Sequence, residues 1–378
     1  MKAVTYQGIK NVQVKEVADP KIEKDDDAII RITSTAICGS DLHLFHGMIP
    51  NLQEDYVVGH EPMGVVEEVG PGVTKLKKGD RIIIPFNIAC GECFYCRHQL
   101  ESQCDHSNDN GDMGAYFGYS GTTGGYPGGQ AEYLRVPYAN FTHFKIPENC
   151  EHPDEKLCLV SDAMTTAFWS VDNAGVKEGD TVIVIGCGPV GLLTQKFAWF
   201  KGAKRVIAVD LLDYRLQHAK RTNHVEIVNI ESDENIGNVL REMTKGGADI
   251  VIDCSGMSGK MSPLESIASG LKLHGGALGG FVIATQAVRK GGTIQVTGVY
   301  SGRYNGFPFG DLFQRNINIR TGQAPVVHYM PYMYELITTG KIDPGDIVTH
   351  VLPLGEAKQG YELFDQRQDN CIKVLLKP

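Results

Sequence analysis

The chain has 378 residues, of which 42% are hydrophobic and 21% are charged, and its formal net charge is -9 at pH 7. Since this is about twice the length of a single domain core, two domains are expected. The charges are scattered rather than grouped into basic blocks, so nucleic acid and anionic membrane surfaces are poor partners for this chain.

The N-terminus and the cysteine content indicate in which cellular compartment the protein is found. The first seventeen residues, MKAVTYQGIKNVQVKEV, alternate like a strand instead of offering a basic region followed by an apolar run. No apolar run approaches the ~20 residues that span a bilayer. Ten cysteines are a low density for this length, so a secreted disulfide framework fits badly. We expect a soluble cytoplasmic protein with no membrane partner.

Short β-rich runs characterise the chain before residue 160. Two examples are AIIRITSTAI at 28–37 and GVVEEVG at 64–70. Turn sequences such as Gly70-Pro71-Gly72 interrupt them. From about residue 325 the pattern is mixed again and ends in a strand-like segment at 371–376.

Four cysteines lie close together in the run CGECFYCRHQLESQC. Cys90, Cys93 and Cys96 are spaced three apart on a tight loop, and a short connecting segment can bring Cys104 back to them. The four thiolates can therefore form a closed tetrahedral shell around zinc. A closed shell leaves no position for a substrate, which predicts a structural site. A redox or disulfide role is the alternative, although cytosolic reduction would leave four crowded free thiols without a purpose.

After residue 160 apolar strands alternate with helical patterns. Strands are predicted at Thr181–Ile185, Arg205–Val209, Asp249–Asp253 and Thr293–Thr297, and a helix at Val190–Lys201. This alternation is typical of βαβ units and of a parallel sheet covered on both faces.

A dinucleotide-binding turn is predicted where the strand VIVI runs directly into GCGPVG and then into a helix. Gly186, Gly188 and Gly191 permit the tight turn, the close approach of backbone to pyrophosphate and the packing of helix on strand. Pro189 and Val190 open the helix, whose N-terminus receives the phosphate charge. The alternative is a tight βα turn that binds nothing.

The second strand of this region ends in Asp210, about twenty residues after the glycine motif, where a carboxylate can accept hydrogen bonds from the adenosine ribose hydroxyls. The same carboxylate would repel a 2′-phosphate, so NAD is predicted rather than NADP. Arg215 either stacks or pairs near the adenosine or is an ordinary solvated helix arginine.

The motifs together resemble a known family. CGSDLH at 38–43, GHE at 59–61, the four-cysteine run, the segment 162–166 and the glycine motif occur in the order and approximate spacing of zinc-containing medium-chain alcohol dehydrogenases. The resemblance covers essentially the whole chain. It implies two zinc ions per chain and a hydride transfer between NAD(H) and the carbon of an alcohol or aldehyde.

The resemblance also implies an α/β fold with two domains. Residues 1–161 and 325–378 form a GroES-like β-rich catalytic domain with a structural zinc lobe at about 88–106. Residues 162–324 form a Rossmann domain with a doubly wound parallel sheet. The active site is expected in the cleft between the two domains.

Transferred residue by residue, the resemblance implies that Cys38, His60 and Asp162 bind the catalytic zinc and leave a fourth position for water or substrate oxygen. Many family members have cysteine where this chain has aspartate. Glu61 either approaches the zinc as an alternative ligand or sits behind it. Asp41 resembles the carboxylate that receives the other N–H of His60 and fixes its tautomer. A surface acid and a capping residue are the alternatives for these two acids.

A mechanism follows from the same resemblance. Zinc acts as a Lewis acid that lowers the pKa of the bound alcohol, and hydride passes to nicotinamide C4. Ser40 would hydrogen-bond the substrate oxygen and pass its proton through the nicotinamide ribose to His43, for release near neutral pH. Thr166 matches the residue that flanks the nicotinamide ring, and Val299 is assigned to its carboxamide.

Two features are similar to the glutathione-independent formaldehyde dehydrogenases. One is the glycine- and tyrosine-rich stretch at 111–129. The other is the long connection between Gly256 and Gly291, whose excess over a compact crossover is roughly residues 258–280. In that subgroup such an insertion covers the cofactor and retains it between turnovers, which permits dismutation of an aldehyde. An ordinary surface insertion is the alternative.

The predicted function is that of a zinc-dependent, NAD-linked alcohol or aldehyde dehydrogenase, with formaldehyde or another small aldehyde among its substrates. A polyol or amino-alcohol dehydrogenase of the sorbitol or threonine type is the alternative within the same chemistry. A noncatalytic NAD-binding protein is the alternative from another class. Bacterial relatives of this branch are commonly tetramers, so a homo-oligomer is expected.

Overall fold

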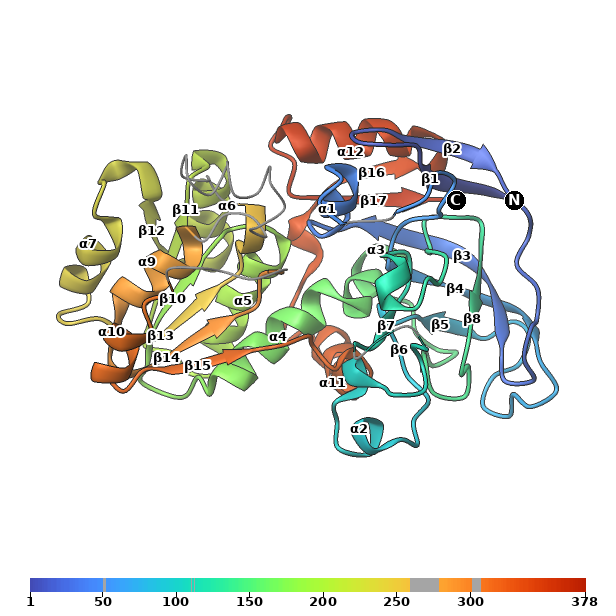
Figure 1. The fold of residues 1–378 in the computed structure, drawn as a ribbon, viewed down its shortest axis with the longest axis horizontal. Helices are drawn as coiled ribbons and strands as arrows, with labels where there is room; N and C mark the ends of the chain where they lie inside the picture. The colour runs from blue at the N-terminus through green and yellow to red at the C-terminus, as the bar shows by residue number, and fades with distance from the viewer. Residues whose placement is uncertain (50–51, 110, 112, 259–278, 301–306) are drawn as a thin grey trace. The chain divides into compact units, whose positions relative to one another are not determined.

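The computed structural model describes residues 1–49, 52–109, 111, 113–258, 279–300 and 307–378 (Figure 1). The chain divides into two compact units, Met1–Thr165 with Ala324–Pro378, and Thr166–Gln323. The predicted division at 161/162 lies four residues before the observed one at 165/166, so Asp162 belongs to the first unit. Most of the predicted insertion at 258–280 lies outside the described residues.

The first unit contains a seven-stranded sheet with the order β16-β17-β3-β4-β5-β9, in which β8 also pairs with β3. Two smaller sheets pair β1 with β2 and β6 with β7. The strands of this unit are β1 (Lys2–Tyr6), β2 (Val12–Glu16), β3 (Ala28–Ile37), β4 (Glu61–Val69), β5 (Arg81–Ile83), β6 (Asn87–Ile88), β7 (Ala115–Tyr116), β8 (Tyr133–Val136), β9 (Phe144–Lys145), β16 (Val348–Pro353) and β17 (Lys373–Lys377).

Short helices surround this sheet, and the longer ones come from the C-terminal segment. Its α-helices are α1 (Asp41–Phe45), α2 (Phe94–Arg97), α3 (Asp154–Leu157), α11 (Val326–Thr338) and α12 (Ala357–Gln366). Its 3-10 helices are η1 (Glu101–Gln103), η2 (Gly121–Thr123), η3 (Cys158–Ser161), η6 (Gly345–Ile347) and η7 (Leu354–Glu356). Among the described helices of the chain, none is long and apolar enough to cross a membrane.

The register of the large sheet brings three distant segments to one end. Strand β3 pairs antiparallel with β4, with Ala36 opposite Glu61, and its last residues also pair with the start of β17. The residues that follow β3, precede β4 and open β17 therefore lie together. These residues are Cys38, His60 and Lys373.

The second unit is a six-stranded sheet with the order β12-β11-β10-β13-β14-β15, and every pair of neighbouring strands is parallel. Its strands are β10 (Thr181–Ile185), β11 (Arg205–Asp210), β12 (Glu226–Asn229), β13 (Ala248–Asp253), β14 (Val288–Val296) and β15 (Asn318–Thr321). Its helices are α4 (Ala163–Ala174, which begins in the first unit), α5 (Pro189–Phe200), α6 (Asp213–Asn223), η4 (Ile230–Ser232), α7 (Ile236–Met243), η5 (Gly256–Ser258), α9 (Gly279–Ala287) and α10 (Phe309–Gln314). The doubly wound sheet predicted for this region is confirmed.

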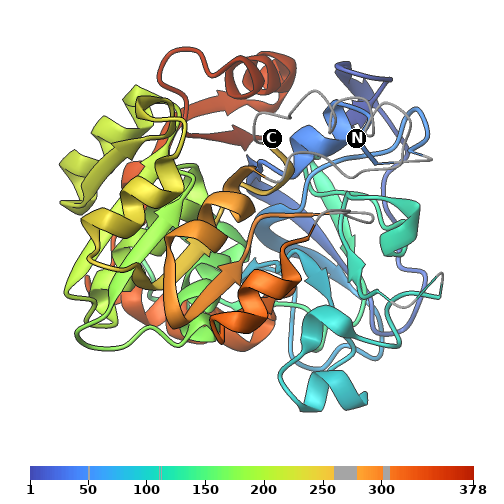
Figure 2. The same ribbon diagram turned by 60° about the vertical axis from the view of Figure 1, so that its left-hand side comes forward.

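Helices cover both faces of the parallel sheet, as the continuous apolar strands require. Alternate residues of β10, Ile183 and Ile185, pack in a core cluster with Leu240 of α7 and Ala284 of α9. The residues between them face the opposite side, where α5 and α6 lie against the sheet (Figures 1 and 2). The strand order reverses next to β10, so the loop that follows this strand lies at the switch point where parallel sheets bind ligands.

Candidate functional site

Four side chains that can bind a metal come together at the end of the large sheet in the first unit. Cys38 directly follows β3, His60 and Glu61 stand at the start of β4, and Asp162 follows η3. One ligand atom from each of the four lies within 4.8 Å of all the others. The structure therefore gathers the residues that the sequence predicted to surround the catalytic zinc.

The distances within this cluster fit a tetrahedral metal. His60 Nε2 lies 3.4 Å from Asp162 Oδ2, and Cys38 Sγ lies 3.8 Å from the same oxygen. A tetrahedral zinc with bonds of about 2.0–2.3 Å separates its ligand atoms by about 3.3–3.8 Å. Thiolate, imidazole and carboxylate are ordinary zinc ligands, and three of them leave a fourth position for a substrate oxygen.

Asp41 lies behind the cluster and holds two of its members. Its Oδ1 is 3.0 Å from His60 Nδ1, an ion-pair contact rather than a linear hydrogen bond. Its Oδ2 accepts hydrogen bonds from the Cys38 N–H at 2.9 Å and from Gln130 Nε2 at 3.1 Å. The Tyr361 hydroxyl donates to Gln130 Oε1 at 2.9 Å. Burial lowers the pKa of His60, but its acidic neighbours, Asp41 foremost, raise it well above the usual value.

Gln130 and Tyr361 were not predicted from the sequence. Gln130 is fully buried and is preceded by two glycines in the run GGQAEY, which is the one local signal that its backbone approaches another segment closely. Tyr361 lies on α12, far away in sequence, and nothing near it in the chain points to the metal cluster.

Glu61 forms a buried ion pair with Lys373, the first residue of β17. Glu61 Oε1 lies 2.6 Å from Lys373 Nζ, and both side chains are 0% exposed. Burial alone lowers the pKa of Lys373, but the carboxylate beside it raises the pKa above its usual range, so Lys373 is protonated. Burial raises the pKa of Glu61, and the charge of Lys373 opposes that shift. Glu61 Oε2 has no hydrogen-bond partner within the described part of the chain. Glu61 thus sits behind the cluster and also within reach of a metal.

Ser40 and His43 lie on the turn and helix that follow Cys38. Ser40 Oγ is 3.2 Å from His60 Nε2, so the hydroxyl is beside the metal cluster. Burial, followed by the nearby His46, lowers the pKa of His43 to about 4, so its ring is neutral at pH 7. A proton that reached His43 would therefore be held weakly. The proton relay through these two residues stays a prediction.

The four cysteines of the lobe form a second cluster. Cys90 Sγ and Cys96 Sγ are 3.9 Å apart, Cys93 and Cys96 are 3.5 Å apart, and Cys93 and Cys104 are 3.9 Å apart. Zinc–sulfur bonds of about 2.3 Å require sulfur separations near 3.8 Å, whereas disulfide sulfurs are about 2.05 Å apart. Backbone N–H groups also point at these sulfurs, as for Cys96 N–H and Cys93 Sγ at 3.5 Å. The arrangement fits zinc and not a disulfide.

Two glycines of the turn after β10, Gly186 and Gly191, stand where a side chain would be strained or would clash. Gly186 has φ +91°, and a Cβ there would come within 3.1 Å of Cys254 backbone. A Cβ on Gly191 would lie 1.8 Å from the Gly186 carbonyl oxygen. Gly188 is the N-cap of α5, and Pro189 occupies the first helical turn, where its missing N–H costs nothing. Val190 follows in the same turn, so the free N–H groups of this turn can receive a phosphate.

Asp210 ends β11 next to this turn. Its Oδ2 accepts a hydrogen bond from the Cys187 N–H at 2.6 Å, and its Oδ1 accepts one from the Leu212 N–H at 2.9 Å. The guanidinium of Arg215 reaches the same place, since its Nη1 is 3.8 Å from the position of a Cβ on Gly188. The structure brings both predicted adenosine contacts to the glycine turn.

The two residues predicted to contact the nicotinamide lie in the second unit. Thr166 is on α4 and opens the second unit. Val299 follows β14, and its carbonyl accepts a hydrogen bond from the Met257 N–H at 3.1 Å. Their roles stay predictions.

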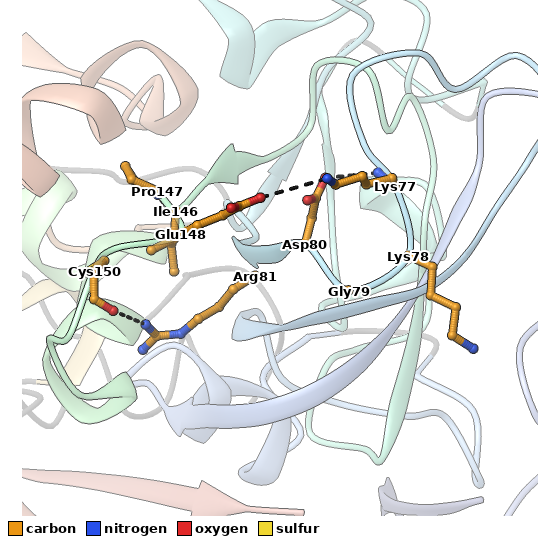
Figure 3. A pocket seen from close by; sticks show the side chains of 9 residues that line it. All are labelled: Lys77, Lys78, Gly79, Asp80, Arg81, Ile146, Pro147, Glu148 and Cys150. Carbon is orange, nitrogen blue, oxygen red and sulfur yellow. Dashed lines mark hydrogen bonds and ion pairs between the residues drawn. The ribbon is translucent and has the colours of Figure 1, made fainter.

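A separate hollow of about 330 Å³ lies on the first unit (Figure 3). Its charged groups already have partners: Lys77 Nζ lies 3.8 Å from Glu148, the Lys77 N–H donates to Asp80 at 2.9 Å, and Arg81 donates to the Cys150 carbonyl at 3.3 Å. We therefore assign it no part in the chemistry. The hollow is lined by Lys77, Lys78, Gly79, Asp80, Arg81, Ile146, Pro147, Glu148 and Cys150.

Comparison with known proteins identifies the family of this chain. Residues 24–148 match the alcohol dehydrogenase GroES-like domain, and residues 189–275 match the zinc-binding dehydrogenase model. The chain is 79% identical to an uncharacterized zinc-type alcohol dehydrogenase-like protein, AdhB, of Bacillus subtilis, over all of both chains. The chain belongs to the zinc-type alcohol dehydrogenase family. The family resemblance and the GroES-like and Rossmann fold predicted from the motifs are thereby confirmed.

Other relatives of this family cover nearly the whole chain. A glutathione-independent formaldehyde dehydrogenase of Pseudomonas aeruginosa is 34% identical over 96% of this chain and 94% of its own length. Among solved structures, the alcohol dehydrogenase TADH from Thermus sp. ATN1 is 34% identical, with a TM-score of 0.85, over 100% of this chain and 99% of that one. Family membership supports an oxidoreductase with bound zinc and leaves the substrate open.

Proposed function

We propose that this protein is a zinc-dependent, NAD(H)-linked dehydrogenase that interconverts small alcohols and aldehydes. The observation that carries the proposal is the cluster of the half-buried Cys38 with the buried His60 and Asp162, whose ligand atoms have the spacing of an open tetrahedral zinc site. The closed four-cysteine cluster, which lies between His60 and Asp162 in sequence, suits a structural zinc, which gives two zinc ions per chain.

The chain's own residues have distinct tasks in this reaction. When bound, the zinc supplies a Lewis acid at the substrate oxygen. Cys38, His60 and Asp162 hold it, and Asp41 fixes the ring of His60. The Ser40 hydroxyl, 3.2 Å from His60 Nε2, is placed to hydrogen-bond the substrate oxygen and take part in moving its proton.

We further propose a closer kinship with formaldehyde dehydrogenases, supported by the relative that is 34% identical. In this proposal the segment at 258–280 retains NAD(H) between turnovers, so that one aldehyde is oxidised while another is reduced. The protein would act in the cytoplasm as a homo-oligomer, with a tetramer expected. A polyol or amino-alcohol substrate is the alternative, which a panel of primary alcohols and polyols separates.

The metal and nucleotide content of the purified protein tests this proposal. Elemental analysis is expected to find two zinc ions per chain, and chromatography of the denatured protein is expected to release one NAD(H). Two zinc ions without nucleotide would contradict cofactor retention and leave an exchanging dehydrogenase. One zinc ion, held by the four cysteines alone, would contradict the proposed catalysis.

The preference for NAD rests on Asp210 and has its own test. Asp210→Ser removes the carboxylate that would bind the ribose hydroxyls and repel a 2′-phosphate, so the ratio of kcat/KM for NAD to that for NADP is expected to fall about 100-fold or more. Steady-state kinetics with both cofactors measures this ratio. Asp213→Ser is the control, because it removes an exposed acid three residues later, at the start of α6. Equal changes in both variants would contradict the assignment.

A further inference from the structure

Tyr119 belongs to the glycine- and tyrosine-rich stretch at 111–129, which neither zinc cluster explains. The residue before it, Gly118, has φ +56°, and a Cβ there would lie 2.4 Å from the Gly59 carbonyl oxygen. Gly59 directly precedes His60, so this close approach places Tyr119 beside the metal cluster. The rings of Tyr119 and His60 meet edge to face, with centroids 6.4 Å apart and an interplanar angle of 87°.

The hydroxyl of Tyr119 is buried and has no hydrogen-bond partner among the described residues. Two other tyrosines of this unit are paired: the Tyr56 hydroxyl donates to the Tyr126 carbonyl at 2.6 Å, and that of Tyr361 donates to Gln130 at 2.9 Å. An unpaired buried hydroxyl is costly, so the Tyr119 hydroxyl calls for a partner, which beside a metal cluster can be a water or a bound substrate.

The phenol of Tyr119 lies within electrostatic reach of the metal cluster. Burial is the main cause that raises its pKa; the charge of His60 lowers the pKa, and the charges of Asp41 and Cys38 raise it. The group is therefore protonated at neutral pH and can both donate and accept a hydrogen bond. Phe86 also lies edge-on to His60, with ring centroids 6.3 Å apart, and is apolar. The two aromatic rings that flank His60 thus offer a substrate one polar and one apolar contact.

We propose that the Tyr119 hydroxyl binds a second oxygen of the substrate, other than the oxygen held at the metal cluster. This inference rests on the proposed function and narrows its substrate class. A hydroxyl on the reacting carbon, as in a hydrated aldehyde, and a hydroxyl on the neighbouring carbon, as in a 1,2-diol, share this chemistry. A monohydric alcohol lacks the second oxygen and leaves Tyr119 unpaired.

The second oxygen takes no part in bond breaking. In a hydrated aldehyde the C–H bond breaks and its electron pair goes with the hydride to NAD+, while one hydroxyl loses its proton as a C=O bond forms. The other hydroxyl stays on the carbon, so the products are a carboxylic acid, NADH and a proton. In a 1,2-diol the neighbouring hydroxyl stays on its carbon, and the product is a hydroxy-carbonyl compound.

The test compares Tyr119→Phe with the unsubstituted protein, both loaded with zinc and supplied with NAD+, on formaldehyde, 1,2-propanediol and 1-propanol. Loss of one hydrogen bond to the substrate is expected to lower kcat/KM for a two-oxygen substrate, relative to 1-propanol, by about 10- to 100-fold. A fall with formaldehyde identifies the hydrate as the ligand, and a fall with 1,2-propanediol identifies the diol. The proposal would be overturned if kcat/KM for formaldehyde and for 1,2-propanediol, each relative to 1-propanol, differed by less than about threefold between Tyr119→Phe and the unsubstituted protein.

Tyr116→Phe is the matched control. Tyr116 lies three residues earlier, its ring packs on Phe86 with centroids 5.3 Å apart, and its hydroxyl is hydrogen-bonded to Gln103. The ratio of kcat/KM for a two-oxygen substrate to that for 1-propanol is expected to change in Tyr119→Phe and not in Tyr116→Phe. An equal change in both variants would overturn the proposal. Tyr119→Phe removes no bond within the described protein, so its Tm without substrate is expected to stay or rise.

A binding measurement separates failure of this inference from failure of the proposed function. 1,2-Propanediol is expected to raise the Tm of the zinc-loaded protein more than that of zinc-loaded Tyr119→Phe. If the unsubstituted protein holds two zinc ions yet oxidises none of the three substrates, the proposed function fails, and the Tm shifts still decide the role of Tyr119. Equal shifts in the two proteins would overturn it.

Discussion

Replacing Lys373 with methionine is expected to destabilise the first unit by about 3–5 kcal/mol at pH 7, because the Glu61 carboxylate is left without its cation in a site where both side chains are 0% exposed. Methionine keeps the length of the side chain, so the loss reports the charge rather than a cavity. Denaturant unfolding of the zinc-loaded protein, followed by circular dichroism, measures the change. Burial already raises the pKa of Glu61, and loss of Lys373 raises it further.

The pH dependence of this variant has a defined sign. A carboxyl whose pKa is raised by folding contributes its full stability below its unfolded pKa and loses it as the pH rises through the folded pKa. The loss in the free energy of unfolding caused by Lys373→Met should therefore become smaller toward pH 4.5 and larger toward neutral pH. Adding Glu61→Gln to Lys373→Met should restore most of the stability at pH 7, since it removes the unpaired buried carboxylate.

A matched variant on the same strand gives the baseline. Lys377 pairs with Glu155 at 2.7 Å, but these side chains are 32% and 37% exposed. Lys377→Met is therefore expected to cost less than about 1 kcal/mol. If Lys373→Met cost no more than Lys377→Met, the pair behind the metal cluster would not be a buried ion pair in solution.

Local sequence patterns were sufficient where a motif is built from neighbouring residues. The four-cysteine lobe lies within residues 90–104, and the glycine turn follows one apolar strand directly, so both could be located from spacing alone. The apolar strands 181–185 and 249–253 were found because a strand buried on both faces is apolar along its whole length.

The partners behind the catalytic cluster could not be found in this way. Lys373 is 312 positions from Glu61, and Tyr361 is 231 positions from Gln130. Only the register that places β17 against β3 brings Lys373 to the cluster. In the sequence it is one of the two lysines that bound an otherwise apolar strand, a pattern that also describes an edge residue facing solvent.

Replacing Asp162 with asparagine is expected to reduce the zinc content from two ions to one per chain and to lower turnover by about 10³-fold or more. The amide matches the shape of the carboxylate but supplies no negative charge to a divalent cation, and the Lewis acid contributes several kcal/mol to the reaction, at 1.4 kcal/mol per tenfold in rate. Elemental analysis and steady-state oxidation of an alcohol with NAD+ measure both quantities on the same preparation.

Two further variants identify the site that is emptied. Asp162→Cys supplies an anionic ligand again, so it should retain the second zinc ion and part of the turnover. Cys104→Ser should also lose one zinc ion, but from the closed cluster, where sulfurs 3.5–3.9 Å apart surround the metal position. A structural metal stabilises the fold, so Cys104→Ser should lower the Tm more than Asp162→Asn does. If Asp162→Asn kept two zinc ions and turnover within tenfold of the parent, Asp162 would not be a ligand, and the open site would have to be built from Cys38, His60 and Glu61 instead.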